Sequence, residues 1–237
     1  MLKIDIFARK KLDSFTVFAS LPDMGRVGGL VSSFLASNTE SKHIATIVSN
    51  HKPWVTIKDG VIGTAKDSYK IYFSDREKLM ILTGDVQPED HRELLELCNT
   101  FLDFCSSVGK VRRIYTAGGS LNELVTGEPR VVSVITKPEL RKVLDSSEID
   151  ILGSEFTTIT WFNGLILGVA SERNIEGIGF YGEISDKSLP QPLAAKSIVK
   201  AFAKIENLSI STKPFDVQYE EVLDHIEKNK GMKKLDQ

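Results

Sequence analysis

The sequence predicts an α/β protein in which helices cover both faces of a mostly parallel sheet. Short segments that are apolar throughout, such as 16–21 and 79–83, alternate with segments whose apolar residues recur at helical spacing. Continuous apolar strands are typical of parallel sheets, because helices bury both of their faces. A length of 237 residues, with 41% hydrophobic and 26% charged side chains, fits a single globular domain of this class.

The first half of the chain alternates predicted strands and helices around one hairpin. Asp59-Gly60 is a typical turn sequence, so residues 55–62 are expected to form the hairpin and residues 71–73 to continue its antiparallel edge. Pro88 is expected to open a long helix that Gly109 ends. The other elements expected here are strands at 16–21, 44–48 and 79–83 and a helix at 27–35.

The second half continues the same alternation and ends in a long helix. A helix of small residues is expected at 164–170, where it would pack closely. The single domain is expected to span residues 1–230, followed by a flexible, lysine-rich tail at 231–237. The other elements expected are strands at 113–117, 131–135, 156–161 and 178–184, and helices at 138–144, at 192–208 and from Pro214 onward.

Composition excludes several classes of protein. Thirty basic against 32 acidic side chains give a net charge of −2, so nucleic acid is not an expected partner. No apolar run has the length needed to cross a membrane, and the first residues lack the apolar core of a secretory signal. Cys98 and Cys105 fall on one predicted helix, too far apart for a disulfide within it. Buried thiols and a cytoplasmic location are therefore expected.

A glycine-rich segment follows the strand at 16–21 and opens the next helix. It contains Gly25, Gly28 and Gly29. The N–H groups after Gly25 would hold a phosphate or carboxylate, and Arg26 would add charge. The alternative is that the glycines allow a tight turn and close packing of helix on sheet. That alternative is favoured, because no Lys-Ser or Lys-Thr pair follows as in a phosphate-binding loop.

Two further polar and glycine segments follow strands: Gly84-Asp85, and Gly118-Gly119-Ser120. In a parallel sheet the carboxyl ends of the strands share one edge, where open α/β folds bind ligands. A candidate cleft is therefore expected at that edge, with Asp85 and Ser120 as its polar contacts. Capping of a turn by Asp85 is an equally good explanation for that residue.

No cofactor or metal site is expected, and no catalytic residues are identified. The pattern Gly-x-Gly-x-x-Gly at 177–182 lacks the following helix that dinucleotide binding requires, and it reads as a strand. Ser120 follows a strand as hydrolase nucleophiles do, but Asn122 stands where the second glycine of the nucleophile elbow belongs. The four histidines show no metal-ligand spacing.

Several segments resemble the proteasome assembly chaperone 2 family in order along the chain. The sequence Leu-Pro-Asp-Met-Gly-Arg-Val-Gly-Gly-Leu at 21–30 resembles its opening motif, and Leu-Thr-Gly-Asp-Val-Gln-Pro at 82–88 resembles its element at a strand end. The other matching segments are 58–60, 115–119, 129–131 and 153–168.

This resemblance implies a three-layer α/β/α fold, similar to that of nucleoside phosphorylases and related hydrolases. It also implies kinship with archaeal and actinobacterial relatives of a eukaryotic chaperone for assembly of the proteasome core particle. A non-enzymatic protein-binding or assembly factor is therefore expected, with proteasome core subunits as possible partners. The alternative is a small-molecule or nucleotide-binding enzyme, similar to ATP-dependent ligases or to phosphorylases, that uses the cleft at the carboxyl ends of the strands.

Two expectations concern partners. The apolar stripe of the last helix and the small residues at 164–170 favour a homo-oligomer, a trimer rather than a tetramer. Family members that dock on the core particle end in a hydrophobic residue, a tyrosine and one further residue, whereas this sequence ends Leu235-Asp236-Gln237. Any contact with the core is therefore expected through a different surface.

Overall fold

The computed structural model describes residues 2–122, 125, 127–153 and 157–233, with side chains up to residue 228. Within these residues, nine strands form one sheet and two form a separate hairpin. The strands are β1 (Lys3–Ile6), β2 (Leu12–Ala19), β3 (Ser41–Val48), β4 (Val55–Lys58), β5 (Val61–Thr64), β6 (Ser68–Ser74), β7 (Leu79–Gly84), β8 (Gly109–Leu121), β9 (Val131–Ile135), β10 (Asp150–Ile151) and β11 (Glu176–Ile184). The helices are η1 (Met24–Arg26), α1 (Val27–Asn38), α2 (His91–Val108), η2 (Pro138–Leu140), α3 (Arg141–Asp145), α4 (Trp161–Glu172), α5 (Pro192–Glu206) and α6 (Pro214–Lys233).

The large sheet has the strand order β1-β3-β6-β7-β2-β8-β11-β9-β10. Its central strands β7, β2, β8 and β11 are parallel, and their core residues are buried as the apolar segments predict. At one end of the sheet, β1, β3 and β6 are joined to one another and to β7 by antiparallel pairing. Toward the other end, β9 is antiparallel to β11. The sheet is therefore mixed, with its parallel part at the centre.

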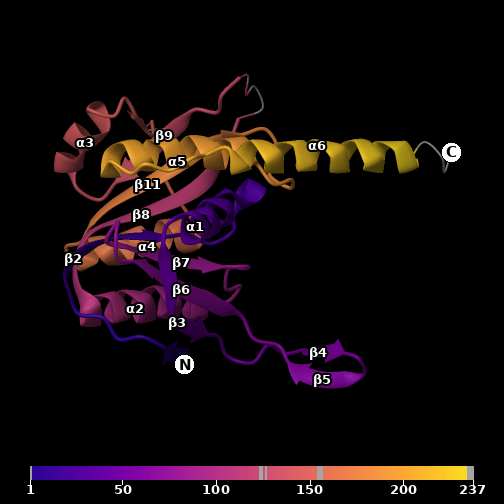
Figure 1. Cartoon of the computed structure of the whole chain (residues 1–237), viewed down its shortest axis with the longest axis horizontal. Coiled ribbons are helices and arrows are strands. Elements are labelled where there is room, and N and C mark those ends of the chain that lie inside the picture. The colour runs from indigo at the N-terminus through magenta and orange to yellow at the C-terminus, as the bar shows by residue number, and fades with distance from the viewer. Residues whose placement is uncertain (1, 123–124, 126, 154–156, 234–237) are drawn as a thin grey trace.

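Helices cover both faces of this sheet, so the predicted three-layer α/β/α arrangement is confirmed (Figure 1). On one face, α2 and α4 lie side by side over a core that includes Phe101 and Phe162. On the other face, α1 and α5 pack together over Phe18 and Phe202, whose rings lie edge to face with centroids 4.9 Å apart. The start of α6 joins this second core, because the Phe215 ring lies 4.4 Å from that of Phe34.

Some predicted elements were wrong in extent or type. The long helix begins at His91 rather than at Pro88, because the Asp90 side chain accepts hydrogen bonds from the N–H groups of Arg92 and Glu93 and so caps it. Of the strand predicted at 156–161, Phe156 lies outside the described residues, 157–160 are not a strand, and Trp161 begins α4. Gly118-Gly119-Ser120 continues β8 instead of forming a corner after it.

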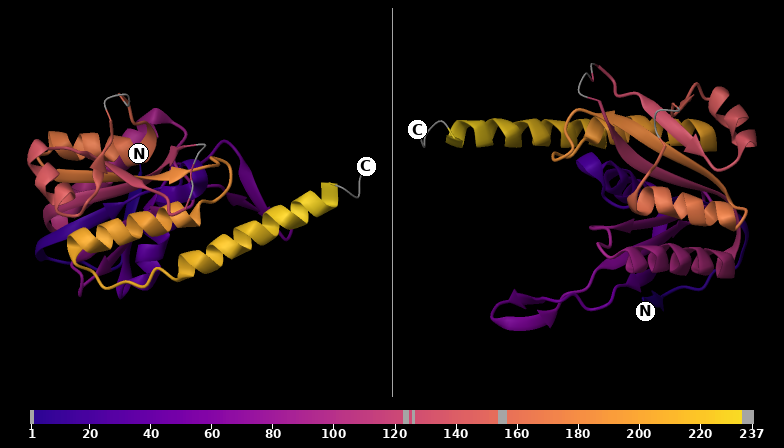
Figure 2. Two further views of the ribbon diagram at one scale, coloured as in Figure 1. Left: turned by 90° about the horizontal axis from the view of Figure 1, so that it is seen from above. Right: turned by 180° about the vertical axis from the view of Figure 1, so that it is seen from behind.

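The predicted hairpin is confirmed, but it forms its own two-stranded sheet away from the body of the protein. Consequently β6, which contains residues 71–73, pairs with β3 and β7 and does not extend the hairpin. Figures 1 and 2 show that the hairpin and α6 project from the body on the same side, separated from each other. The helix α6 extends through Lys233, past the predicted start of the tail at residue 231; a flexible end at 234–237 stays a prediction, since those residues lie outside the described part.

Candidate functional site

A cleft of about 670 Å³ opens at the carboxyl ends of the central strands. It lies between the segment after β2, the end of β8, β11 and the first turn of α4, as expected for an open α/β sheet. Its apolar walls are formed by Pro22, Met24, Leu121, Leu152, Ile159 and Trp161. Its polar lining comes from Asp23, Gln87, Ser120, Thr158, Thr160, Asn163 and Tyr181, together with the backbone of Gly119.

Asp23 is held in the cleft by two backbone hydrogen bonds. Its Oδ1 accepts from the Gly28 N–H at 2.8 Å, and its Oδ2 accepts from the Gly119 N–H at 2.7 Å. Burial raises the pKa of this carboxyl from 3.8 to about 6, although the hydrogen bonds from Gly28 and Gly119 act to lower it. Each oxygen keeps the capacity to accept a further hydrogen bond. The cleft therefore contains a carboxylate that is strongly desolvated but still charged at neutral pH.

Two amide side chains fasten the segment before Asp23 to α4. Asn163, which is buried, accepts from the Leu21 N–H at 3.0 Å and donates to the Leu21 carbonyl at 3.1 Å. Gln87 donates to the Pro22 carbonyl at 2.5 Å and accepts from the Phe162 N–H at 2.8 Å. Both amides are engaged at both ends, so they position the walls of the cleft.

Trp161 lines the cleft in an unusual backbone conformation. It is the first residue of α4 and has φ 65°, in the left-handed region that residues with a side chain seldom adopt. Such a conformation costs on the order of 1–3 kcal/mol and is often found at binding sites. The indole is 50% exposed. The structure thus presents a large aromatic surface beside the carboxylate-bearing segment.

Only part of the predicted site lines this cleft. Gly119 and Ser120 do so directly, from the last residues of β8. Gly118 lies beneath it: a Cβ there would stand 2.8 Å from the Asp23 Oδ2 and 2.9 Å from the Tyr181 ring, so glycine is needed for these groups to converge.

The other predicted residues lie elsewhere. Gly29, Gly84 and Asp85 line a separate cavity of about 240 Å³, which shares Pro22 with the main cleft. Gly25 and Gly28 line neither cavity. The Gly25 N–H donates to the Lys187 carbonyl at 2.9 Å.

The start of α1 already holds an acceptor from the protein itself. The Arg26 N–H donates to the Asp23 carbonyl, and the Gly28 N–H donates to the Asp23 carboxylate. A Cβ at Gly28 would lie 2.5 Å from the Leu21 carbonyl oxygen, which explains this glycine by close packing. An external anion would have to displace Asp23 from this helix end.

Sequence reasoning overlooked the residues that shape the cleft: Asp23, Gln87, Trp161, Asn163 and Tyr181. Asp23 and Gln87 were within segments already singled out for their glycines or prolines. A carboxylate followed by a helix-opening glycine turn was an available signal for Asp23, since aspartate commonly accepts from such N–H groups. Asn163 offered no comparable signal, because its partner lies 142 residues away in sequence.

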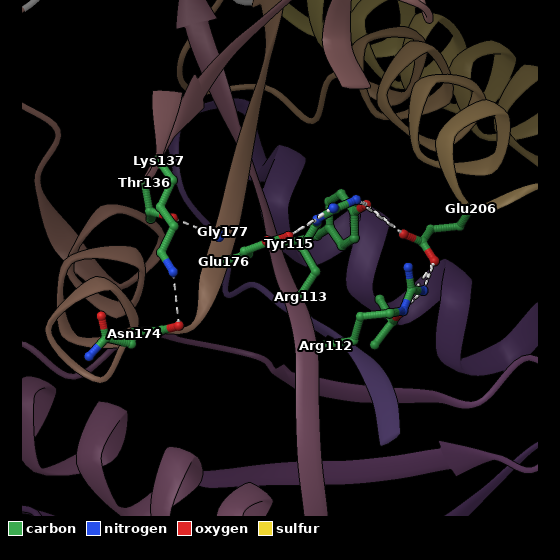
Figure 3. Close-up of polar contacts among 10 residues, drawn as sticks. Arg112, Arg113, Tyr115, Thr136, Lys137, Asn174, Glu176, Gly177 and Glu206 are labelled. Atoms are coloured by element: carbon green, nitrogen blue, oxygen red, sulfur yellow. Dashed lines mark hydrogen bonds and ion pairs between the residues drawn. The ribbon is translucent and has the colours of Figure 1, made fainter. Parts of the chain in front are cut away.

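A second polar cluster lies near the opposite, amino-terminal edge of the parallel strands (Figure 3). Tyr115 is fully buried, and its hydroxyl donates to Glu206 at 2.5 Å and accepts from Arg113 at 3.2 Å. Arg113 also pairs with Glu176 at 2.9 Å, and Arg112 pairs with Glu206. This cluster ties α5 to β8 and β11, and its groups satisfy one another, as in a structural ion-pair network.

The described residues exclude some kinds of site. They contain no group of three or more His, Cys, Asp or Glu side chains arranged to hold a metal ion. No helix among them is both long and apolar enough to span a bilayer. Cys98 and Cys105 are buried free thiols on α2, and burial raises the pKa of Cys98 to about 12.

Comparison with known proteins identifies the family from the sequence as a whole. The model of the PAC2 family matches residues 17–230, which include nearly every element of the fold and both sides of the cleft. The chain belongs to the PAC2 family. An uncharacterised protein of Methanocaldococcus jannaschii, MJ1210, is 26% identical over 238 residues, covering 97% of this chain and 90% of that protein.

Solved structures of PAC2-type proteins have the same fold. PbaB of Pyrococcus furiosus, described as an archaeal proteasome activator, is 27% identical with a TM-score of 0.83, covering 97% of this chain and 98% of PbaB. PbaA of the same organism, described as an archaeal homologue of proteasome-assembly chaperone, is 18% identical with a TM-score of 0.78 over the whole of both chains. At that identity, the likeness to PbaA concerns the fold alone.

Proposed function

We propose that this PAC2 protein is a cytoplasmic, non-enzymatic binding factor that acts on the proteasome core particle or its subunits. The observation that carries the proposal is the match to PbaB, which extends over almost the full length of both chains. A match that covers 97% of this chain and 98% of PbaB leaves few residues of either chain without a counterpart.

The chemistry of the cleft also favours binding over catalysis. Its one acidic side chain, Asp23, is already engaged by two backbone N–H groups, and no histidine is among the described residues that line it. Ser120 therefore lacks a neighbouring base that would activate it as a nucleophile. General acid–base catalysis normally requires a second positioned group, which this lining does not supply.

The hairpin arm, formed by β4 and β5, is the best candidate for self-association. Val55, Ile57 and Ile62 share one face of it, because Ile57 lies directly opposite Ile62. These three side chains are between 52% and 72% exposed. A two-stranded hairpin is marginally stable in water, so covering this face would stabilise it. The two ends of the hairpin segment are joined to each other by the Lys52–Asp67 ion pair at 2.6 Å.

The proposed occupant of this face is the projecting part of α6 from a second copy. That helix carries exposed apolar side chains, including Val217 and Leu223. It also carries a series of acidic residues, and two exposed lysines stand near the apolar face: Lys66 follows β5, and Lys58 is on the opposite face of the hairpin. A heterologous contact from hairpin to helix forms a ring when its rotation closes, and for this ring we favour a trimer. The acidic residues are Asp216, Glu220, Glu221, Asp224 and Glu227.

The self-association is tested by light scattering on the whole chain. The double substitution Ile57→Lys and Ile62→Lys should release monomers, because it places charge in the proposed interface. Thr56→Lys is the matched control, since Thr56 pairs with Gly63 on the opposite face of the same hairpin. A wild-type mass of 26.3 kDa across micromolar concentrations would contradict the proposal.

The action on the core particle is tested by surface plasmon resonance with a purified archaeal core particle. We expect saturable binding with Kd below about 10 μM, typical of specific transient complexes. Binding should persist in Thr56→Lys. An absence of binding to both the assembled core particle and its free α subunits would refute this function, whatever the oligomeric state.

The alternative is a small-molecule or nucleotide-binding enzyme, similar to a ligase or phosphorylase. The observation in its favour is the 670 Å³ cleft itself, which has the size and position of a ligand pocket in an α/β fold. Calorimetric titration with ATP and with nucleosides tests it directly. The alternative is supported only if ATP or a nucleoside binds and the substitution Leu121→Arg, at the rim of the cleft, changes the affinity for that ligand.

A further inference from the structure

The charge of the cleft is confined to one group. Among the described residues that line it, Asp23 is the only one ionised at neutral pH. Tyr181 stays neutral there, because burial, and then the charge of Asp23, raise the pKa of its phenol. In the described part of the chain no basic side chain forms an ion pair with Asp23, since only burial and backbone hydrogen bonds affect its pKa.

This arrangement is unfavourable for anions. A nucleotide or phosphate needs lysine, arginine or free N–H groups, and the described lining contains no lysine or arginine. The N–H of Gly28, at the start of α1, is already bonded to Asp23, as is that of Gly119. A phosphate in the cleft would therefore meet a negative carboxylate and no compensating charge.

The same arrangement suits a cation that carries an apolar chain. A desolvated carboxylate with unused lone pairs forms strong charge-assisted hydrogen bonds with an ammonium group. The exposed indole of Trp161 offers an aromatic surface for the cation or for its carbon chain. Met24 and Leu121, which are also exposed, continue the apolar wall. A volume of about 670 Å³ is large enough for a chain of several carbons.

We propose that the cleft binds a primary ammonium group on an alkyl chain, with the ammonium at the Asp23 carboxylate and the chain against Trp161, Met24 and Leu121. Two sources share this chemistry: a free alkylamine, and the lysine side chain of a partner protein. The inference depends on the cleft alone and is independent of binding to the proteasome core particle.

The first test compares three probes of equal length by calorimetry at pH 7.5. Hexylammonium should bind at least about tenfold more tightly than 1-hexanol, and hexanoate should bind more weakly than either. Leu121→Arg should weaken hexylammonium binding at least about tenfold, because it adds a positive charge at the exposed rim. Leu95→Arg is the matched control, since it adds the same charge at an exposed position of α2 that does not line the cleft, and it should leave the affinity unchanged.

The second test varies pH and needs no substitution. With a pKa of about 6, Asp23 is mostly protonated at pH 5.0, so hexylammonium affinity should fall about tenfold from its value at pH 7.5. Affinity for 1-hexanol should not change. Of the neighbouring groups, Tyr181 stays neutral over this range because burial raises the pKa of its phenol, and no histidine lines the described cleft.

A third comparison separates the two sources. The peptide acetyl-Leu-Lys-Leu-amide should bind more tightly than hexylammonium if the ligand is a partner's lysine, and less tightly if it is a free amine. Either order supports the proposal, provided that the norleucine version of the peptide binds at least about tenfold more weakly. Equal affinity for hexylammonium and 1-hexanol, or tighter binding of hexanoate or inorganic phosphate, would overturn it.

Discussion

Replacing Asn163 with alanine tests whether one amide holds the cleft together. The side chain is buried and makes two hydrogen bonds with the backbone of Leu21, at 3.0 and 3.1 Å. Its removal leaves a buried N–H and a buried carbonyl without partners, at about 1–3 kcal/mol each. We therefore expect the free energy of unfolding to fall by about 2–5 kcal/mol. The midpoint of thermal unfolding should fall by roughly 5–15 °C in a chain of this length.

The control and a second substitution make this test specific. Asn38→Ala removes one part-buried bond, from an exposed side chain to the Phe34 carbonyl in the same helix, and should cost no more than about 1 kcal/mol. Asn163→Asp keeps the acceptor for the Leu21 N–H, but it places a carboxylate against the Leu21 carbonyl. Relative to wild type, it should be less stable at pH 8 than at pH 4, because only the protonated form can donate. Equal stability of Asn163→Ala and Asn38→Ala in urea unfolding would refute this reasoning.

Three further predictions follow from the other buried polar groups. The pKa of Asp23 is about 6 in the folded protein and 3.8 when the group is unperturbed, so its stabilising contribution is present below about pH 4 and lost as pH rises through 6. Relative to Asp23→Asn, the free energy of unfolding should therefore fall by about 2–3 kcal/mol between pH 4 and 7. A difference between the two proteins that stays constant with pH would contradict the raised pKa. Cys98 and Cys105 should not react with a thiol reagent at pH 8 until the protein unfolds, because burial raises the pKa of both thiols. Rapid labelling of the native protein would contradict this prediction and show that α2 opens readily. Glu206→Ala should lower the free energy of unfolding in urea by about 2–4 kcal/mol, because the Tyr115 hydroxyl loses its hydrogen-bond acceptor. Adding Tyr115→Phe should recover part of that stability. If it does not, the loss has a cause other than the Tyr115 hydroxyl.

The centre of the sheet could be predicted because strands buried on both faces consist almost entirely of apolar residues. The strands at 16–21 and 79–83 are apolar throughout, and only a covered, parallel environment suits such segments. The strands at the edges of the sheet were harder to predict from the sequence. β1 has only four residues, of which Lys3 and Ile6 are exposed, so its pairing with β3 gives little signal in the sequence. The strand predicted at 156–161 failed at its end, where a positive φ at Trp161 starts a helix without any sequence cue.

The candidate site stays a prediction, and the structure shows where its residues lie. Gly119 and Ser120 line the cleft at the carboxyl edge of the strands. Their neighbours at Gly84 and Asp85 belong to another cavity, because Pro22 stands between the two hollows. Which side chain faces which cavity depends on strand order across the sheet. Spacing along the chain carries little of that information.

The bridges made by Asn163 and Gln87 have a consequence for how the protein opens. The backbone groups they fasten lie at Leu21, Pro22 and Phe162, so segments far apart in sequence close the cleft together. No local fluctuation can release one wall without breaking bonds to the other. Amide hydrogens at Leu21 and Phe162 should therefore exchange with solvent only at the rate of global unfolding. A ligand that fills the cleft would accordingly slow exchange across the whole sheet, and its affinity could be read from amides that never touch it.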